Sequence, residues 1–325
     1  MKIGITSTIP IEVVFAAGHQ PCDLNNLFIN HADPGHFIHL AEDAGFPRTS
    51  CAWTKGLYGV MLEQKIEKII IVSGGDCSNG IALGEILSDD GREVMPFSYP
   101  LTPDSRQMTQ AINDLADRLQ APIGATNEIK AGLDRIRLRL GELDRLTWQS
   151  GQVSGAENLL FLVGASDFNG EPRLFANDLN TFLGQAARRR PANPTIRLGL
   201  AGVPPILSNL FPTLEQLGAA VVFNEVPRQF AMLQGPDTSL AEQYSLYTYP
   251  YSVTGRLRDI IHACEERRLD GIIHYTQSFC FRQIEDILFK RQLPVPCLTL
   301  EADQPGAIDG RTLTRLETFI EMLKG

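Results

Sequence analysis

The sequence lacks the features that mark several large classes of protein. Its 29 Lys and Arg residues are outnumbered by 38 Asp and Glu, which gives a formal net charge of −9. No overall basic field attracts nucleic acid or an anionic membrane, so neither is expected as a partner. No apolar run approaches the length of a membrane span. Residues 1–6 read as a strand and not as a secretory signal. We therefore expect a soluble, cytoplasmic protein.

Closely spaced metal-binding cysteines are also missing. The chain has six cysteines: Cys22, Cys51, Cys77, Cys264, Cys280 and Cys297. None forms a CxxC motif or a ferredoxin-like run. Disulfides are not expected in a reducing cytoplasm, so each thiol is either a small buried residue or a ligand. Cys264 and Cys297 read as core residues, and Cys22 as a loop thiol near a cleft.

Short apolar runs alternate with amphipathic stretches along most of the chain. The runs predict strands at 1–6, 69–72, 94–99, 196–200, 219–223, 271–275 and 296–300. The amphipathic stretches predict helices at 57–67, 80–87, 174–187, 257–268, 283–290 and 313–323. This alternation implies parallel sheets covered by helices on both faces. The predicted fold class is α/β, with two flavodoxin- or Rossmann-like doubly wound parallel-sheet domains joined by a helical segment.

The predicted domain organisation has three parts. Residues 1–103 form an N-terminal α/β domain that carries Cys51 and Cys77. Residues 104–193 are charged, with apolar residues at helical spacing, and read as a helical connector. Residues 194–325 form a C-terminal α/β domain that carries Cys280. In this domain Pro204 and Pro205 predict the start of a helix.

One arrangement occurs in both halves of the chain. An apolar strand leads into Cys77 and a helix, and a second apolar strand leads in the same way into Cys280. Ligands of open α/β sheets bind outside the carboxyl ends of the strands, and a helix N-terminus favours a thiolate. Cys51 also lies at a loop-to-helix junction. Three such thiolates suit an iron–sulfur cubane, while the loose spacing by itself is also that of buried structural thiols, the default for isolated cysteines.

Several other side chains are candidates for chemistry. Glu12 reads either as a proton donor or acceptor or as a helix-start carboxylate. Ser73 and Ser278 lie near the cluster cysteines and either hydrogen-bond sulfur or a substrate oxygen or only form turns. His274 reads as a core histidine. The three histidines of residues 31–39 allow a zinc site, although their spacing is not diagnostic.

Residues 8–21 contain a P-x-E…A-A-G-x-x-P segment, and Cys51 is followed by Lys55-Gly56 and Tyr58-Gly59. These motifs resemble the N-terminal segment and the first cluster cysteine of the 2-hydroxyacyl-CoA dehydratase and benzoyl-CoA reductase family, in the form of the 2-hydroxyglutaryl-CoA dehydratase D-component. The resemblance spans nearly the whole chain, including residues 196–225, and is most specific at the two ends. Asp76-Cys77 stands inverted against the family's usual Cys-Asp, so that match is positional.

The C-terminal part carries the closest resemblance. Phe279-Cys280 and residues 294–303 and 314–322 are similar to the family's C-terminal signature. The resemblance implies a 4Fe-4S cluster held by Cys51, Cys77 and Cys280 at the interface of flavodoxin-like domains. Some relatives carry a bridged double-cubane cluster instead and reduce small molecules.

The resemblance also implies partners and an activity. A cluster-containing, ATP-hydrolysing activator delivers low-potential electrons, and the chain pairs with a copy of itself or with a paralogous subunit. The implied activity belongs to anaerobic metabolism: a 2-hydroxyacyl-CoA thioester is dehydrated through a ketyl radical, or a related acyl-CoA-type substrate is reduced. Two further hypotheses stay open, a non-catalytic cluster-bearing subunit and a metal-free two-domain binding protein.

Overall fold

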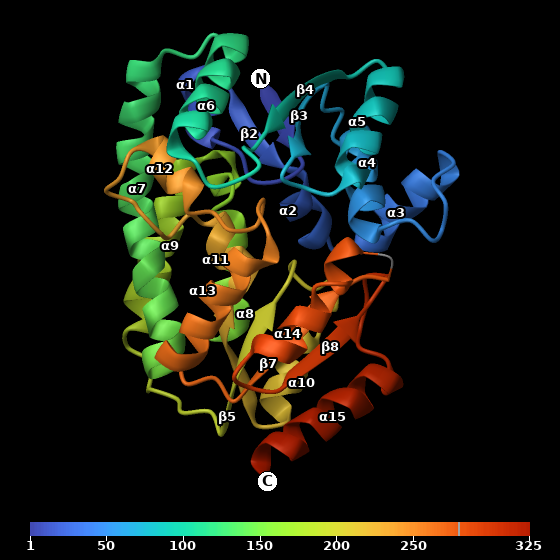
Figure 1. The fold of residues 1–325 in the computed structure, drawn as a ribbon, viewed down its shortest axis with the longest axis vertical. Coiled ribbons are helices and arrows are strands. Elements are labelled where there is room, and N and C mark those ends of the chain that lie inside the picture. The colour runs from blue at the N-terminus through green and yellow to red at the C-terminus, as the bar shows by residue number, and fades with distance from the viewer. Residues whose placement is uncertain (279) are drawn as a thin grey trace. The chain divides into compact units, whose positions relative to one another are not determined.

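In the computed structural model, which describes residues 1–278 and 280–325, the chain forms two four-stranded parallel sheets (Figure 1). This confirms the predicted α/β fold class with two doubly wound domains. Phe279 of the C-terminal motif lies outside the described residues. No helix formed by the described residues has the length and apolar composition needed to cross a bilayer.

Each sheet belongs to a unit assembled from several stretches of chain. Unit 1 comprises Met1–Leu138, Gly164–Asn177 and Phe230–Tyr251. Unit 2 comprises Arg139–Val163, Asp178–Gln229 and Ser252–Gly325. Residues 104–193 are largely helical, as predicted, and are shared between the two units. The domain boundaries at 103 and 193 stay predictions.

The sheet of unit 1 has the strand order β2-β1-β3-β4, with every pairing parallel. Its strands are β1 (Lys2–Ile5), β2 (Gln20–Asp23), β3 (Lys68–Gly74) and β4 (Glu93–Ser98). Residues 69–72 of β3 are all buried, as expected of an inner β-branched strand that is covered on both faces.

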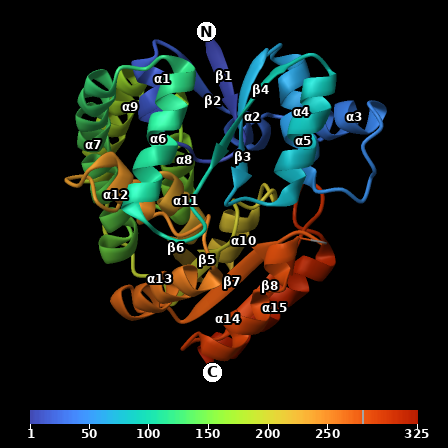
Figure 2. The same ribbon diagram turned by 45° about the horizontal axis from the view of Figure 1, so that its top comes forward.

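Helices cover both faces of this sheet. Figure 2 shows α4 (Ala52–Glu63) and α5 (Ser78–Asp89) on one side, and α1 (Ile11–Ala16) and α6 (Ser105–Leu119) on the other. Further helices with residues in unit 1 include α2 (Leu24–Ile29), α3 (Pro34–Asp43), α7 (Ile123–Arg145), η2 (Phe168–Gly170), α9 (Pro172–Ala186) and α12 (Leu240–Ser245).

Side-chain caps fix where several helices begin. The carboxylate of Asp104 accepts hydrogen bonds from the first backbone N–H groups of α6. Ser239 and Glu242 form a capping box at the start of α12. Each cap satisfies N–H groups that have no partner within the helix, which is why these residue types precede helices.

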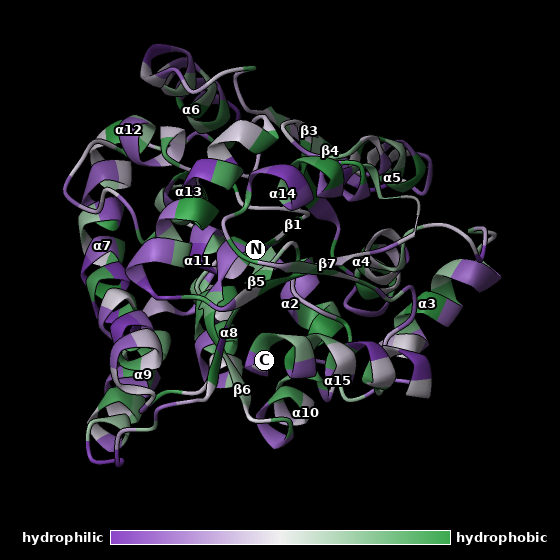
Figure 3. Ribbon diagram, turned by 60° about the horizontal axis from the view of Figure 1, so that its bottom comes forward, coloured by the Kyte–Doolittle hydropathy of each residue, from purple (hydrophilic) through white to green (hydrophobic). Residues whose placement is uncertain are grey.

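The sheet of unit 2 repeats the order of the first, as β6-β5-β7-β8, again with every pairing parallel. Its strands are β5 (Ile196–Ala201), β6 (Ala219–Asn224), β7 (Gly271–Thr276) and β8 (Cys297–Glu301). In Figure 3 strands β5 and β6 are coloured mainly as hydrophobic. A buried core that includes Leu257, Ile260, Cys264 and Phe289 packs against them.

That core comes from α13 (Val253–Glu266) and α14 (Asp286–Gln292) on one face of the sheet. On the other face α15 (Gly310–Lys324) packs closely, because the side chains of Phe319 and Leu323 lie against Gly271 of β7. Further elements with residues in this unit are η1 (Leu146–Ser150), α8 (Gly155–Gly164), α10 (Leu210–Gln216), α11 (Glu225–Phe230) and η3 (Phe281–Gln283).

The shared strand order places a topological switch point in each unit. In unit 1 the chain leaves β1 toward β2 on one side and leaves β3 toward β4 on the other, and in unit 2 the connections that leave β5 and β7 diverge in the same way. Doubly wound sheets bind ligands at such points, outside the carboxyl ends of the strands. In unit 1 this region contains the residues that follow β1 and β3, which are 6–10 and 75–77.

Two expectations were wrong. Cys22 is not a loop thiol: it lies in β2, an edge strand without an apolar run, and it is buried. Burial raises the pKa of the Cys22 thiol to about 12. Pro204 and Pro205 do not begin a helix, since α10 begins at Leu210.

Candidate functional site

Each of the three predicted ligand cysteines lies directly before a helix. Cys51 is the N-cap residue of α4 and Cys77 that of α5, both in unit 1. Cys280 precedes the short helix η3 in unit 2. The predicted loop-to-helix positions of these cysteines are therefore the observed ones. Unit 1 contributes two of the thiols and unit 2 the third.

Cys51 and Cys77 are close enough to interact electrostatically. Burial, with further contributions from Asp76 and Cys51, raises the pKa of the Cys77 thiol to about 11. The backbone N–H groups of Asn79 and Gly80 act in the opposite direction, because they favour the thiolate. Two half-buried N-cap thiols, one with backbone donors beside it, fit the role of cluster ligands, since a bound metal ion replaces the thiol proton.

The family motif around Cys51 has a structural explanation in α4. Lys55 is fully buried, and its ammonium donates hydrogen bonds to Glu42 Oε1 at 2.8 Å and to the carbonyl oxygen of Arg48 at 3.0 Å. The hydrogen bond from Lys55 lowers the pKa of Glu42. Lys55 thus ties the loop before Cys51 to the helix that follows it.

The two glycines of the same motif allow close helix packing. A Cβ atom on Gly56 would lie 2.5 Å from the ring of Phe28 in α2. A Cβ atom on Gly59 would lie 2.3 Å from the carbonyl oxygen of Phe37 in α3. Helix α4, which begins after Cys51, is therefore held against α2 and α3 at distances that only glycine permits.

The turn before Cys77 is also tightly packed. Gly75 has φ +97°, a left-handed conformation that favours glycine. A Cβ atom on Gly75 would lie 2.7 Å from Pro250 Cβ and 3.0 Å from Tyr99 Cβ. Residues from three distant stretches of unit 1 thus meet immediately before Cys77.

Tyr99 connects this turn to the residues that follow β1. Its hydroxyl donates a hydrogen bond of 2.8 Å to the carbonyl oxygen of Thr8. Its ring packs edge-on against the ring of Tyr251, with 6.3 Å between the centroids. Burial raises the pKa of Tyr251 to about 12, so the phenol keeps its proton at neutral pH. Within the described residues, Thr8 Oγ1 and the Tyr251 hydroxyl oxygen are both buried and make no hydrogen bond.

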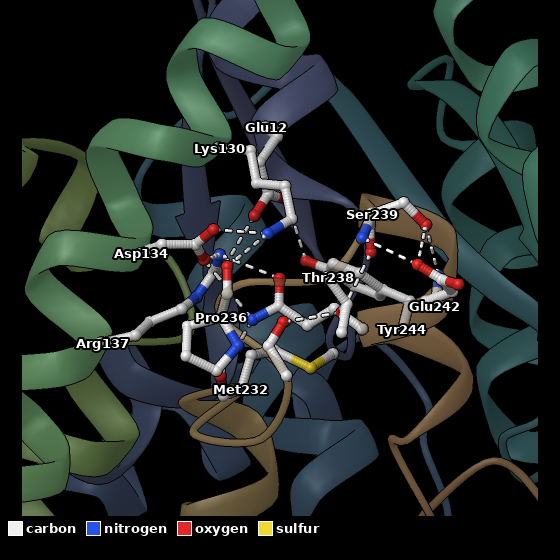
Figure 4. Close-up of polar contacts among 12 residues, drawn as sticks. Glu12, Lys130, Asp134, Arg137, Met232, Pro236, Thr238, Ser239, Glu242 and Tyr244 are labelled. Carbon is white, nitrogen blue, oxygen red and sulfur yellow. Dashed lines mark hydrogen bonds and ion pairs between the residues drawn. The ribbon is translucent and has the colours of Figure 1, made fainter.

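Glu12 is the centre of a buried polar network (Figure 4). Its carboxylate accepts a 2.6 Å hydrogen bond from Arg137 Nη2 and lies 3.1 Å from the hydroxyl of Tyr244. That hydroxyl also lies 2.7 Å from the carbonyl oxygen of Ile9. Burial and the neighbouring Glu12 carboxylate hold the pKa of Tyr244 well above its usual range. Glu12 lies in the first turn of α1, and a role of its carboxylate as a proton donor or acceptor stays a prediction.

Of the two candidate serines, Ser73 lies near the end of β3 and Ser278 follows β7. The hydroxyl of Ser73 donates to the carbonyl oxygen of Phe97 at 3.2 Å, which joins β3 to β4. The backbone N–H of Ser278 donates to Asp303 Oδ1 at 2.7 Å. Both contacts are those of residues that shape strand ends, and their proposed contact with a cluster or substrate stays a prediction.

A second buried ion-pair network supports the segment after Cys280. Arg256 donates to Glu225 through Nε at 2.7 Å and through Nη2 at 2.8 Å, and it also pairs with Glu285. Burial raises the pKa of Glu225, but Arg256 outweighs it, so the net effect lowers that pKa. Arg282, two residues after Cys280, donates to Glu285 Oε1 at 3.1 Å. These contacts hold η3 to the body of unit 2.

His31, His36 and His274 each contact a residue of their own unit. His274 is completely buried, and its Nδ1 lies 3.2 Å from Asp286 Oδ1, as expected of a core histidine with a partner. In the 31–39 segment, His36 Nε2 lies 2.6 Å from Glu63 Oε2, and His31 contacts the backbone of Asp33. Among the described residues of either unit, no three His, Cys, Asp or Glu side chains are arranged to hold a metal ion.

Several residues of this site were not predicted. Tyr99 and Pro250 reach the Cys77 turn through tertiary contacts, which leave no periodic signal in the sequence. Lys55 stands inside a recognised motif, yet its burial depends on Glu42 of a neighbouring helix. For Arg137 the sequence held one clue to burial. This arginine lies in the same helical stretch as Leu133 and Leu140, which are buried.

Comparison with known protein families identifies the family of the chain. The model of the family described as 2-hydroxyglutaryl-CoA dehydratase, D-component, matches residues 6–323 of the chain. The matched region therefore includes all three cysteines that precede helices. No curated protein matches the chain significantly.

Proposed function

The chain belongs to the 2-hydroxyglutaryl-CoA dehydratase D-component family, and we propose that it is a dehydratase component that binds a 4Fe-4S cluster through Cys51, Cys77 and Cys280. One observation carries the proposal: two interacting N-cap thiols lie at the carboxyl edge of the unit-1 sheet, next to its switch point. Buried structural thiols need neither a helix N-terminus nor a neighbouring thiol. Ligands of a shared cluster must lie near one another, and a helix N-terminus favours the thiolate form in which they bind iron.

The protein's own residues hold and orient the cluster in this proposal. Cys51 and Cys77 supply two thiolates from unit 1, and Cys280 supplies the third from unit 2. Lys55 fixes the loop that presents Cys51, and Arg282 fixes the residues after Cys280. When bound, the cluster supplies low-potential one-electron chemistry and one iron without a cysteine ligand, which is open to a substrate oxygen.

The proposed substrate is a small 2-hydroxyacyl-CoA thioester. The hydroxyl group leaves from C2 and a proton leaves from C3, so the products are a 2-enoyl-CoA and water. No electron is consumed overall, which means that the electron from the ATP-hydrolysing activator is returned at the end of each turnover. The proposed assembly is a dimer with a second copy or with a paralogous subunit.

Turnover tests this proposal. Anaerobically purified protein is mixed with an ATP-hydrolysing activator protein of this enzyme class, ATP and 2-hydroxyglutaryl-CoA, and the enoyl-CoA product is measured by chromatography. We expect ATP-dependent product formation that is lost in Cys77→Ala and kept in Cys264→Ala, whose thiol lies in the core of unit 2. Turnover that survives in Cys77→Ala would contradict the proposal. Activity only after addition of a paralogous subunit would identify a non-catalytic cluster-bearing component instead.

A further inference from the structure

We infer that an exposed apolar face beside Cys280, formed by Phe281, Ile284 and Ile287 of unit 2, binds the same face of a second copy of the chain. The two faces run antiparallel and are related by a two-fold axis. The inference rests on the dimer of the proposed function, and it names the surface and the partner that the proposed function leaves open.

Three large apolar side chains within seven positions are exposed to solvent. The exposed fraction is 46% for Phe281, 71% for Ile284 and 51% for Ile287. A single exposed apolar residue is common on a protein surface and needs no explanation. Several of them together, directly after a proposed ligand cysteine, indicate a surface that binds another molecule.

Backbone hydrogen bonds place the three side chains on one side of their segment. The N–H of Ile284 donates to the carbonyl oxygen of Phe281 at 3.1 Å, and the N–H of Ile287 donates to that of Ile284 at 3.3 Å. Bonds between residues three apart wind the chain at three residues per turn, so side chains at this spacing point the same way. The apolar face is therefore continuous from η3 into the start of α14.

The opposite side of the segment is anchored in unit 2. Glu285 pairs with Arg282 and with the buried Arg256, and Asp286 lies 3.2 Å from the ring nitrogen of the buried His274. Removing one partner of such buried pairs is costly, so they fix the rotation of the segment about its own axis. The apolar face is thus held outward by the fold, and a partner meets a surface that is already in place.

The two ends of the apolar face carry charges of opposite sign. Lys290 and Arg291 form the last turn of α14, and both are exposed. At the other end lies the exposed carboxylate of Glu301, which accepts a hydrogen bond from Gln283 of η3. One surface therefore combines an apolar centre with a basic end and an acidic end.

This pattern is complementary to itself. In the antiparallel arrangement Ile284 of one copy faces Ile284 of the other, and Phe281 faces Ile287. Arg291 of each copy then faces Glu301 of the other, so opposite charges meet at both ends. An apolar centre with a charged rim is the usual make-up of an interface, and two-fold contacts are the commonest in homo-oligomers. A different partner would have to supply the reversed pattern, whereas a second copy already carries it.

Sedimentation equilibrium of the full-length, anaerobically purified protein tests the inference. The dissociation constant of the dimer is measured for the wild type, Ile284→Asp and the control Leu160→Asp. Leu160 is a matched control because it is an apolar residue of α8 in unit 2 that is 57% exposed. We expect Ile284→Asp to raise the dissociation constant at least about 30-fold, since each dimer contains the change twice. Leu160→Asp should leave it unchanged.

A charge exchange tests the two-fold arrangement itself. Arg291→Glu brings like charges together at both ends of the contact, and so does Glu301→Lys. Each variant alone should therefore dissociate roughly 3- to 10-fold more readily than the wild type. A mixture of the two variants should form a heterodimer as stable as the wild-type dimer, because each end then joins opposite charges.

Three results would overturn the inference: a wild type that stays monomeric, a dimer that Ile284→Asp leaves intact, or a mixture that is no more dimeric than its two components. The iron content of the same samples separates the inference from the proposed function. Monomeric wild type that holds iron removes only the docking surface. Iron-free protein whose dimer responds to the substitutions as expected removes the cluster and leaves the docking surface in place.

Discussion

Asp23 and Asp167 are two buried acidic residues of unit 1 that a hydrogen bond joins. The backbone N–H of Asp23 donates to Asp167 Oδ2 at 2.6 Å, and the hydroxyl of Ser166 donates to Asp23 Oδ2 at 2.5 Å. Burial, and then the charge of Asp23, raise the pKa of Asp167 to about 7. Burial raises the pKa of Asp23 as well. The native state therefore keeps a proton on this pair at a pH where the unfolded chain has lost it.

This pair predicts a pH dependence of stability. A carboxyl whose pKa is raised in the folded state stabilises that state below its unfolded pKa, near 4, and the stabilisation is lost as pH rises toward 7. Relative to Asp167→Asn, the wild type should lose roughly 1–3 kcal/mol of unfolding free energy between pH 5 and pH 8. Urea denaturation at both pH values measures this loss. Asp117→Asn is the control, because that carboxylate is exposed. If Asp167→Asn loses as much unfolding free energy between the two pH values as the wild type, Asp167 is not the source of the pH dependence.

The ion pair of Glu12 and Arg137 predicts a large coupling energy. Arg137→Met leaves the Glu12 carboxylate buried without its cation, so we expect a loss of about 3–5 kcal/mol in unfolding free energy. The double variant Glu12→Gln/Arg137→Met should cost less than the two single changes together. Arg139→Met is the control, because that arginine forms a half-exposed pair with Glu142 and should cost less than about 1 kcal/mol. If the losses of unfolding free energy in the two single variants simply add in the double variant, Glu12 and Arg137 do not stabilise the fold as a pair.

At the residue scale, the sequence predicted where a residue stands relative to strands and helices better than it predicted which residues contact one another. Cys51, Cys77 and Cys280 stand before helices as expected, because a strand, a turn and a helix can each be read locally. The partners of Lys55 lie up to 13 positions away, and Arg137 and Glu12 are 125 positions apart. No spacing rule connects such residues, so only the folded chain shows that they meet.

Helix α4 makes a testable claim at the scale of elements. A methyl group at Gly59 would collide with the backbone of α3, which cannot move as a side-chain end can. Gly59→Ala should therefore lower the unfolding free energy by about 1–3 kcal/mol. Gly132→Ala in α7 is the matched control, because its nearest neighbour is an arginine side chain 3.9 Å away. There the greater helix propensity of alanine should leave stability unchanged or slightly raised. Thermal unfolding of both variants decides the claim, and equal melting temperatures would contradict it.

The elements that the sequence predicted well share a strong local pattern. The inner strands β3 and β7 are continuous apolar runs and lie where they were expected. Strand β2 was missed because it reads Gln-Pro-Cys-Asp and pairs only with β1 at the sheet edge. The start of α10 was misplaced because Pro204 and Pro205 are compatible with a loop as well as with a first helical turn.

At the scale of the whole molecule, the repeated strand order is the feature that local patterns predicted best. Two sets of alternating strands and helices implied two doubly wound sheets, and both are present. The composition of the units was not predictable, because residues 230–251 belong to unit 1 although their neighbours on both sides belong to unit 2. Tertiary contacts, such as that of Tyr244 with Glu12, hold residues 230–251 in unit 1.

The central claim is that three cysteines from two units bind one cluster, and the iron and acid-labile sulfide content of anaerobically purified protein tests it most directly. We predict about four irons and four sulfides per chain. This content should fall sharply in Cys51→Ser, Cys77→Ser and Cys280→Ser and stay unchanged in Cys264→Ser, which alters a thiol buried in the unit-2 core. About eight irons per chain would indicate the double-cubane alternative. Wild-type protein without iron, or undiminished iron in the three variants, would contradict the account.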